Sequence, residues 1–240
     1  MTIESPETPI KKTRTVIIAI ISITIFYLLY KAYQYSNIKF RTQELIPYDK
    51  DLNWETPPNC EYDSKLYDAI LADMFICSSS NTPFISNLKY DYLDLEMIKK
   101  VLLAGARYIE FTVIENDLSD DPTPVIAKKI PNDAMTTTFN SLELADVCYT
   151  VIKFAFQSFY DDKNQFAENR YPLFVYFDIQ SKNINLLNDV ANTIKNIWRD
   201  RLLDDTYNHA FNDLAHVPLC KLFGKIVIMT DRADDYQSSQ

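Results

Sequence analysis

Residues 94–114, D-L-E-M-I-K-K-V-L-L-A-G-A-R-Y-I-E-F-T-V-I, contain a helix signal followed directly by a strand signal. Four apolar residues recur at the spacing of one helix face: Leu95, Ile98, Val101 and Leu102. Asp94 is a residue type that caps a helix start, and Gly105 is one that ends a helix. Residues 108–114 then form a largely apolar run, typical of a strand that is buried on both faces.

Short apolar runs and amphipathic helices alternate over the rest of the chain. Strands are predicted at residues 74–78, 108–114, 173–179 and 225–230, with a short one at 125–126. Helices are predicted at residues 94–104, 142–159 and 184–202. This alternation indicates parallel β/α units, so the predicted fold class is α/β. Four parallel strands of this kind make half of a (β/α)8, or TIM, barrel.

The composition narrows the range of functions and sources. The chain has 240 residues, 47% of them hydrophobic, which is enough for one domain with a core. Its net charge is -9, and a nucleic-acid-binding protein needs a basic face, so no nucleic-acid partner is expected. Only two glycines occur beside many Asn, Ile, Lys, Tyr and Asp residues. This bias suggests an AT-rich coding genome, such as that of a large DNA virus or a protist.

Residues 16–33, V-I-I-A-I-I-S-I-T-I-F-Y-L-L-Y-K-A-Y, form an almost uninterrupted apolar run. As a helix this run spans roughly 27 Å, close to the hydrocarbon thickness of a bilayer. A cleaved signal peptide is the alternative, but bulky tyrosines stand where a small-x-small cleavage site would lie. We therefore expect a single-pass membrane protein. Basic residues flank both ends of the run, which leaves its orientation open.

The organisation along the chain follows from this run. A polar tail is expected at residues 1–14, a transmembrane anchor at 15–35 and a proline-containing juxtamembrane linker at 36–60. The folded domain is expected at residues 61–232, followed by an acidic tail at 233–240.

The four cysteines are Cys60, Cys77, Cys148 and Cys220. Their spacing matches neither a zinc knuckle nor a dense disulfide framework, so we interpret them as small buried hydrophobic residues in a reducing compartment. The chain also has no N-x-Ser/Thr sequon, which disfavours a lumenal domain. We therefore expect the domain to face the cytosol, from a virion membrane or an internal membrane of the host.

Five blocks of the chain resemble, in order, the X region of phosphatidylinositol-specific phospholipase C, the catalytic half of that enzyme's barrel. The first block is F-I-C-S-S-S-N-T-P-F at residues 75–84, where the family reads F-I-x-S-S-H-N-T-Y-L. The other four are L-L-A-G-A-R-Y-I-E at 102–110, P-V-I at 124–126, Y-P-L-F-V-Y-F-D at 171–178 and L-F-G-K-I-V-I at 222–228. The resemblance covers about residues 70–232, and its strength lies in the order and spacing of all five blocks.

The resemblance implies catalytic positions at the C-terminal ends of the strands. In the family, two histidines stabilise the phosphate and protonate the leaving group, while a calcium ion lowers the pKa of the attacking inositol hydroxyl. Ser80 and Lys128 stand at the two histidine positions, and Asp178 stands where the family has a catalytic-face Glu. The catalytic candidates are therefore Ser80, Lys128 and Asp178. Lys128 and Lys129 are the candidates for substrate binding.

The same resemblance implies a weakened calcium site. Its ligand candidates are Asn81, Glu110 and Asp178, while Thr112 replaces a ligand carboxylate, so calcium is a doubtful cofactor. A purely structural role for these three residues is the alternative, as turn and strand-end groups that hydrogen-bond to loops. The chain has only two histidines, His209 and His216, outside the matched blocks. We expect both to be ordinary surface or helix-face residues.

Two functions remain open at this point. The loss of both histidines favours a membrane-anchored pseudoenzyme that serves as a structural or lipid-headgroup-binding module, because a hydroxyl and an unperturbed ammonium are poor proton donors at neutral pH. A divergent but active phosphoric diester hydrolase that cleaves phosphoinositides is the alternative. The second half of the family's barrel does not appear in the sequence. The expected partners are therefore membrane lipid and either a second copy or another chain that completes the barrel.

Overall fold

The computed structural model describes residues 9–45, 69–85, 91–116, 123–128, 138–160, 166–207 and 213–230. The chain divides into two compact units, residues 1–44 and 45–240. The first unit holds α1 (Pro9–Leu45), a single helix of 37 residues. Within it, Val16–Arg41 has a mean hydropathy of 2.0 and is long and apolar enough to cross a membrane. The helix continues to Leu45, through the first part of the segment predicted as a linker.

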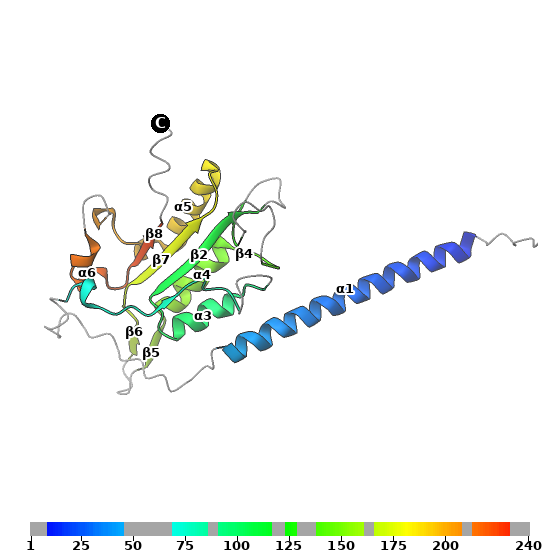
Figure 1. Ribbon diagram of the computed structural model, residues 1–240, viewed down its shortest axis with the longest axis horizontal. Helices are drawn as coiled ribbons and strands as arrows, with labels where there is room; N and C mark the ends of the chain where they lie inside the picture. The colour runs from blue at the N-terminus through cyan, green and yellow to red at the C-terminus, as the bar shows by residue number, and fades with distance from the viewer. Residues whose placement is uncertain are drawn as a thin grey trace, which may run out of the picture. The chain divides into compact units, whose positions relative to one another are not determined.

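The second unit is built on a mixed six-stranded sheet. Its strands are β1 (Ser78–Ser79), β2 (Tyr108–Glu115), β3 (Pro124–Ile126), β4 (Leu142–Glu143), β7 (Leu173–Ile179) and β8 (Ile226–Met229). The order is β4-β3-β2-β7-β8, and β1 also pairs with β2 (Figure 1). β1, β2, β7 and β8 run parallel, whereas β3 is antiparallel to β2 and β4. A separate hairpin joins β5 (Ser158–Tyr160) to β6 (Phe166–Glu168).

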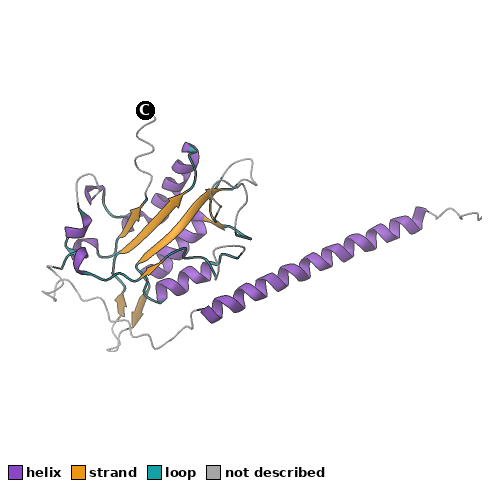
Figure 2. Cartoon of the chain, in the orientation of Figure 1, coloured by secondary structure: helices purple, strands orange, loops and turns teal. Residues whose placement is uncertain are grey.

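Three helices cover one face of this sheet: α3 (Leu95–Leu103), α4 (Leu144–Ala155) and α5 (Ile184–Trp198) (Figures 1 and 2). The remaining helical elements are η1 (Leu71–Asp73), η2 (Arg199–Arg201), η3 (Asp205–Tyr207), η4 (Leu214–His216) and α6 (Leu219–Leu222). η1 lies beside η4 and α6, where Ile70 bridges Pro218 and the Leu219 N–H donates to the Ala69 carbonyl at 2.9 Å. The parallel strand–helix units confirm the predicted α/β class.

The core lies between the helices and the sheet, and a row of aromatic side chains joins its parts. Trp198 at the end of α5 stacks on Phe177 of β7 with ring centroids 6.1 Å apart, and Phe177 lies 5.9 Å from Phe111 of β2. All three side chains are buried. The Trp198 indole N–H also donates to the Cys148 carbonyl of α4 at 3.0 Å, so the polar atom of the buried ring is satisfied.

Both glycines of the chain occupy positive-φ positions that side chains rarely adopt. Gly105, with φ of 99°, ends α3 two residues past Leu103, and the Asp94 carboxylate begins that helix by accepting the Glu96 N–H at 3.0 Å. This confirms the predicted cap and stop. Gly224 has φ of 71°, and a Cβ there would lie 3.1 Å from the Arg201 guanidinium. It precedes β8 and donates its N–H to the Arg170 carbonyl at 2.6 Å.

Most predicted elements are present, but the limits of three of them are wrong. The strand predicted at 74–78 is present only at Ser78–Ser79. Residues 74–77 form no strand, although the Cys77 carbonyl accepts from the Tyr108 N–H at 3.2 Å, and Phe75 is fully exposed. The helix predicted at 142–159 begins at Leu144 and ends at Ala155, with β4 before it and β5 after it. The helix predicted at 184–202 ends at Trp198, where Arg199 adopts a positive φ and a 3-10 turn follows.

The interpretation of the cysteines is partly wrong. Cys148 is a buried free thiol as predicted, and burial raises its pKa to about 12. Cys77 is free but exposed, just before β1. Cys220 forms a disulfide rather than a free thiol, so the chain does not consist of reduced cysteines alone. Cys60 lies outside the described residues.

Candidate functional site

The candidate site lies on the sheet face away from the helices, where β1 ends beside the first half of β2. Alternate residues of β2 enter the core, among them Ile109 and Phe111, so Glu110 and Thr112 lie on the opposite face. The same alternation in β7 places Asp178 on that face. Thr112 and Asp178 are direct partners in the β2–β7 register. Ser80 follows β1, and Lys128 follows β3 by two residues.

Four of these side chains form one continuous hydrogen-bonded chain. The Lys128 ammonium donates to the Asn81 amide oxygen at 2.9 Å, and the Asn81 amide nitrogen donates to the Ser80 hydroxyl at 3.0 Å. The Ser80 hydroxyl in turn donates to the Glu110 carboxylate at 2.8 Å. The sequence predicted each of these four residues as a site residue, and the fold brings them together from β1, β2 and β3. We call this set the rim network.

The loop that carries Ser80 and Asn81 is tied to β2 by a residue that sequence reasoning missed. Thr82 is only 2% exposed, and its hydroxyl accepts the Glu110 N–H at 3.1 Å while it donates to the Ser79 carbonyl at 3.2 Å. Its own N–H donates to the Glu110 carbonyl at 3.2 Å. The N-T pair within the block at residues 75–84 was the available signal for this role.

Asn81 has a left-handed backbone, with φ of 49°. Asparagine tolerates this region better than most side chains, because its short amide satisfies local hydrogen bonds. The conformation turns the chain sharply after β1, and the Asn81 amide bonds both Ser80 and Lys128. Asn81 is therefore both the turn residue and the central link of the rim network.

Asp178 lies on the same face as Glu110 but has a separate partner. Its carboxylate accepts a hydrogen bond from the Gln180 side-chain amide nitrogen at 2.7 Å. Thr112, where the family resemblance implies a carboxylate, is 5% exposed and its carbonyl accepts the Ala127 N–H at 3.2 Å. Among the described residues, no three His, Cys, Asp or Glu side chains gather closely enough to hold a metal ion.

The charged side chains at the site are the Glu110 and Asp178 carboxylates and the Lys128 ammonium. Tyr108 precedes Glu110 by two residues on the same face, and its phenol pKa is raised by burial and by the Glu110 charge. Lys128 is half-buried beside Asn81. Lys129, the second predicted substrate-binding residue, lies outside the described residues. The arrangement offers one ammonium, one hydroxyl and two carboxylates, without an imidazole among the described groups of the rim network.

His216 lies apart from the rim network, and His209 is not among the described residues. His216 is exposed in η4, and its Nδ1 lies 2.7 Å from the Asp213 carboxylate. This contact lowers the pKa of Asp213, mainly through the hydrogen bond to His216. His216 is thus a surface residue, as predicted, and His209 lies outside the described residues.

Two solved structures resemble the fold of this chain. The crystal structure of L. pealei PLC21 matches with a TM-score of 0.52 and 19% sequence identity, covering 72% of this chain and 20% of that one. The crystal structure of S. officinalis PLC21 matches with a TM-score of 0.51 and 21% identity over the same shares. At this identity the matches establish the fold alone, and the chain spans about a fifth of either protein. No curated protein matches the chain.

The family comparison is more specific than the structural matches, because a sequence model of one family matches most of the folded unit. The model of the phosphatidylinositol-specific phospholipase C X domain matches residues 67–232, from just before η1 to just after β8. This match covers more than half of the chain and includes all five blocks and every residue of the rim network. The chain therefore belongs to the phosphatidylinositol-specific phospholipase C X-domain family.

Proposed function

We propose that this phospholipase-C-like domain binds the phosphate of an inositol lipid headgroup without hydrolysing it. The observation that carries the proposal is the rim network, in which the residues at both family histidine positions are engaged with the remaining polar groups. Lys128 supplies a positive charge for a phosphate oxygen, and Asn81 and Ser80 supply hydrogen-bonding groups next to it.

Loss of proton transfer follows from the chemistry of the two substitutions. The Ser80 hydroxyl donates to Glu110 and has no ionisation near neutral pH, so it cannot act as an imidazolium does. An ordinary lysine ammonium keeps its proton near pH 7 and is a poor general acid. Each general acid or base contributes about 10² to 10⁴ in rate, so loss of both removes most of the hydrolytic rate.

Calcium does not suit the donor set of the rim network. The Asn81 amide oxygen accepts a hydrogen bond from the Lys128 ammonium, which puts a cation next to a predicted metal ligand. Glu110 accepts from Ser80, and Thr112 supplies no carboxylate. Calcium prefers six to eight oxygen ligands with several carboxylates, so the proposed headgroup binding does not depend on it.

Hydrolysis and binding are tested on the same preparation. Full-length protein in nonionic detergent is mixed with a short-chain, water-soluble phosphatidylinositol, with calcium or with a chelator. We expect binding by calorimetry under both conditions and no release of inositol phosphate. The double variant Ser80→His, Lys128→His should not recover full activity, because Thr112 remains.

Two lysine substitutions test whether Lys128 binds the headgroup. Lys128→Gln should weaken headgroup binding about tenfold, since one charge-assisted contact contributes about 1.5 kcal/mol. The control Lys221→Gln removes an exposed charge in α6 and should leave binding unchanged. Equal binding by the two variants would disprove the assignment.

An active, divergent diester hydrolase is the second candidate. The retained carboxylates Glu110 and Asp178, on one face of the sheet, are the observation in its favour. Calcium-dependent turnover in the assay above, lost in Glu110→Gln, would establish it and reject catalytic silence.

We also propose that α1 is retained as a membrane anchor and that the folded unit faces an oxidising compartment. The apolar helix supports the first point, and the Cys220 disulfide supports the second, because disulfides persist mainly outside reducing compartments. This reverses the expected cytosolic orientation, which rested on free cysteines and on the absence of an N-x-Ser/Thr sequon. The protein should resist carbonate extraction, and the folded unit should be protected from protease added to the cytosolic side. Digestion from the cytosolic side would restore the opposite orientation.

A further inference from the structure

The row of side chains that crosses the sheet at Glu110 differs in charge on its two sides. β1 and β3 pair with one edge of β2, while β7 pairs with the other edge and is followed by β8. The rim network lies on the β1 and β3 side, where Lys128 supplies its cation. On the other side, Tyr176 of β7 is the direct partner of Glu110, and Met229 of β8 is the direct partner of Tyr176. Paired residues of a ladder share a face, so these side chains continue the face of the rim network.

The strands on the β7 and β8 side supply carboxylate and uncharged groups to this face. Among the described strands, β2, β7 and β8 contain no lysine or arginine. Glu110 and Asp178 contribute two carboxylates, against the single ammonium that Lys128 brings to the rim network. The uncharged neighbours on the same face are half-buried: Tyr108, Tyr176 and Met229. A ligand that is held at Lys128 and extends toward β7 therefore meets carboxylates and tyrosine rings.

Hydrogen-bond chemistry decides which ligand groups fit beside these two carboxylates. An ionised carboxylate only accepts hydrogen bonds, and it offers about four lone-pair sites. Glu110 accepts one bond from Ser80 and Asp178 accepts one from Gln180, so both carboxylates can accept further donors. A ligand hydroxyl is such a donor. A phosphate group offers acceptor oxygens and negative charge instead, so it gains no hydrogen bond from a carboxylate and is repelled by it.

We propose that this face selects an inositol headgroup with a single phosphate, whose ring hydroxyls donate to Glu110 and Asp178. This selectivity rests on the proposed function, which places the phosphate at Lys128. Each further phosphate on the ring would bring about 1.5 to 2 negative charges near pH 7 to a face with two carboxylates. The half-buried rings of Tyr108 and Tyr176 supply apolar surface for the C–H groups of the cyclitol. Phosphatidylinositol fits this description, and its 4,5-bisphosphate does not.

Two matched lipids test the selectivity on the full-length protein in nonionic detergent. Short-chain phosphatidylinositol and phosphatidylinositol 4,5-bisphosphate with identical acyl chains are titrated by calorimetry in the presence of a chelator. We expect the bisphosphate to bind about tenfold more weakly, because its extra phosphates lie beside carboxylates. Equal or tighter binding of the bisphosphate would overturn the selectivity and leave headgroup binding intact. Binding of neither lipid would reject the proposed function and the selectivity with it.

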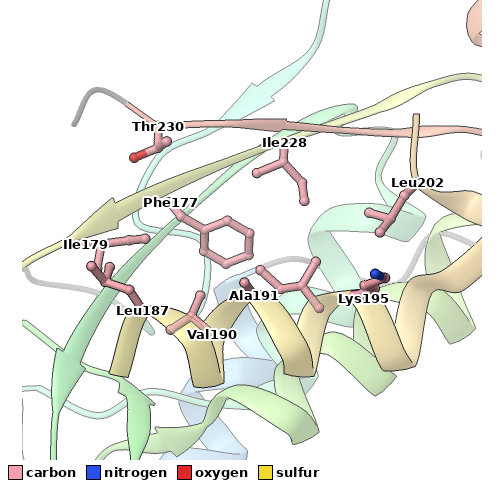
Figure 3. Close-up of a pocket in the computed structure, with 10 residues that line it drawn as sticks. Phe177, Ile179, Leu187, Val190, Ala191, Lys195, Leu202, Ile228 and Thr230 are labelled. Carbon is pink, nitrogen blue, oxygen red and sulfur yellow. The ribbon is translucent and has the colours of Figure 1, made fainter. Parts of the chain in front are cut away.

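Lysines added to the two faces of β8 form a matched pair of variants. Met229→Lys adds a cation to the face of the rim network and should reduce the preference for phosphatidylinositol to less than about threefold. Ile228 lies on the opposite side of β8, where it lines an apolar pocket against α5 (Figure 3). It is 42% exposed, so Ile228→Lys adds the same charge there and should leave the preference unchanged. Equal changes in both variants would contradict the proposal, because net charge rather than this face would set the preference. Thermal melts establish that each variant keeps the fold.

Removal of a carboxylate and a change of salt give two further readouts of the same preference. Asp178→Asn keeps the size of the side chain but replaces one acceptor oxygen by an amide that can donate to a phosphate, so it should narrow the preference. Asp189→Asn neutralises an exposed carboxylate on α5 and should not narrow it. The preference should also shrink as salt rises, because salt screens repulsion between partly exposed charges. A preference that neither Asp178→Asn nor salt reduces would overturn the assignment to charge on this face.

Discussion

The core beneath β2 and β7 and the rim network on the opposite face of β2 are built from different kinds of interaction. The core residues Phe111, Phe177 and Trp198 are buried and contact one another through their rings. The rim residues are exposed or half-buried and contact one another through single hydrogen bonds. Adjacent residues such as Phe111 and Glu110 belong to opposite sets. The fold therefore depends on one face of the strands, and the chemistry of the other face can change without loss of the fold.

The largest expected effect is at the centre of the core. Trp198→Ala removes a buried ring that stacks on Phe177 and the indole N–H that satisfies the Cys148 carbonyl. Replacement of a buried aromatic ring by Ala costs about 3–5 kcal/mol of unfolding free energy. Denaturant unfolding of the full-length protein measures the loss. Tyr149→Ala, which truncates a 60% exposed ring on α4, is the control and should cost less than about 1 kcal/mol. Similar losses for both would contradict the division into core and surface.

The next effect is a pH dependence that distinguishes a core thiol from an exposed one. Burial raises the Cys148 pKa from 9.0 to about 12 in the folded protein. The folded state therefore holds this proton more tightly than the unfolded state does. The resulting stability is complete below about pH 9 and is lost between about pH 9 and pH 12. The raised pKa of Tyr108 acts in the same direction.

Alkaline unfolding curves of two variants measure this contribution. Cys148→Ala should flatten the decline of stability between pH 9 and pH 11, whereas Cys77→Ala should not. Iodoacetamide should modify Cys77 in the native protein and Cys148 only after unfolding, because Cys77 is exposed and Cys148 is buried. Rapid native modification of Cys148 would show that α4 opens locally.

A smaller loss of unfolding free energy is expected at the N-terminus of α3. The Asp94 carboxylate accepts the Glu96 N–H, and Asp94→Ala leaves that donor without its cap. The loss should be about 1 kcal/mol, while Asp94→Asn retains an acceptor and should cost only a few tenths. Thermal unfolding of both variants tests this. Equal losses would mean that the charge rather than the hydrogen bond stabilises the helix.

The difference between core and rim also decides what could be predicted from the sequence. Period-two and period-3.6 patterns report burial, so the strand at 173–179 was predicted with its correct limits and α3 to within one residue. The predicted boundaries are wrong where a hydrophobic pattern extends past the element that the chain forms. Residues 74–77 are apolar but form no strand. Residues 142–143 form the short strand β4, although the helix pattern of α4 includes them.

The rim was predictable only through the family resemblance. Ser80, Asn81, Glu110 and Lys128 are separated by up to 48 positions, and no periodicity relates them. Their contacts depend on the parallel register of β1 with β2 and on the turn at Asn81. Thr82 was missed because a short polar residue in a loop has no pattern that reveals its burial.

The smallest effect on stability should come from the rim network itself. Ser80→Ala breaks two hydrogen bonds, one to Glu110 and one from Asn81, at an exposed position where water can replace both partners. The unfolding free energy should therefore change by less than about 1 kcal/mol. The same substitution should alter headgroup binding, because it frees the Glu110 carboxylate to repel a phosphate. A stability loss above about 2 kcal/mol would contradict this account and would make the rim part of the fold. A small loss together with weaker binding would show that substitutions at the family histidine position change what the rim binds while the core stays intact.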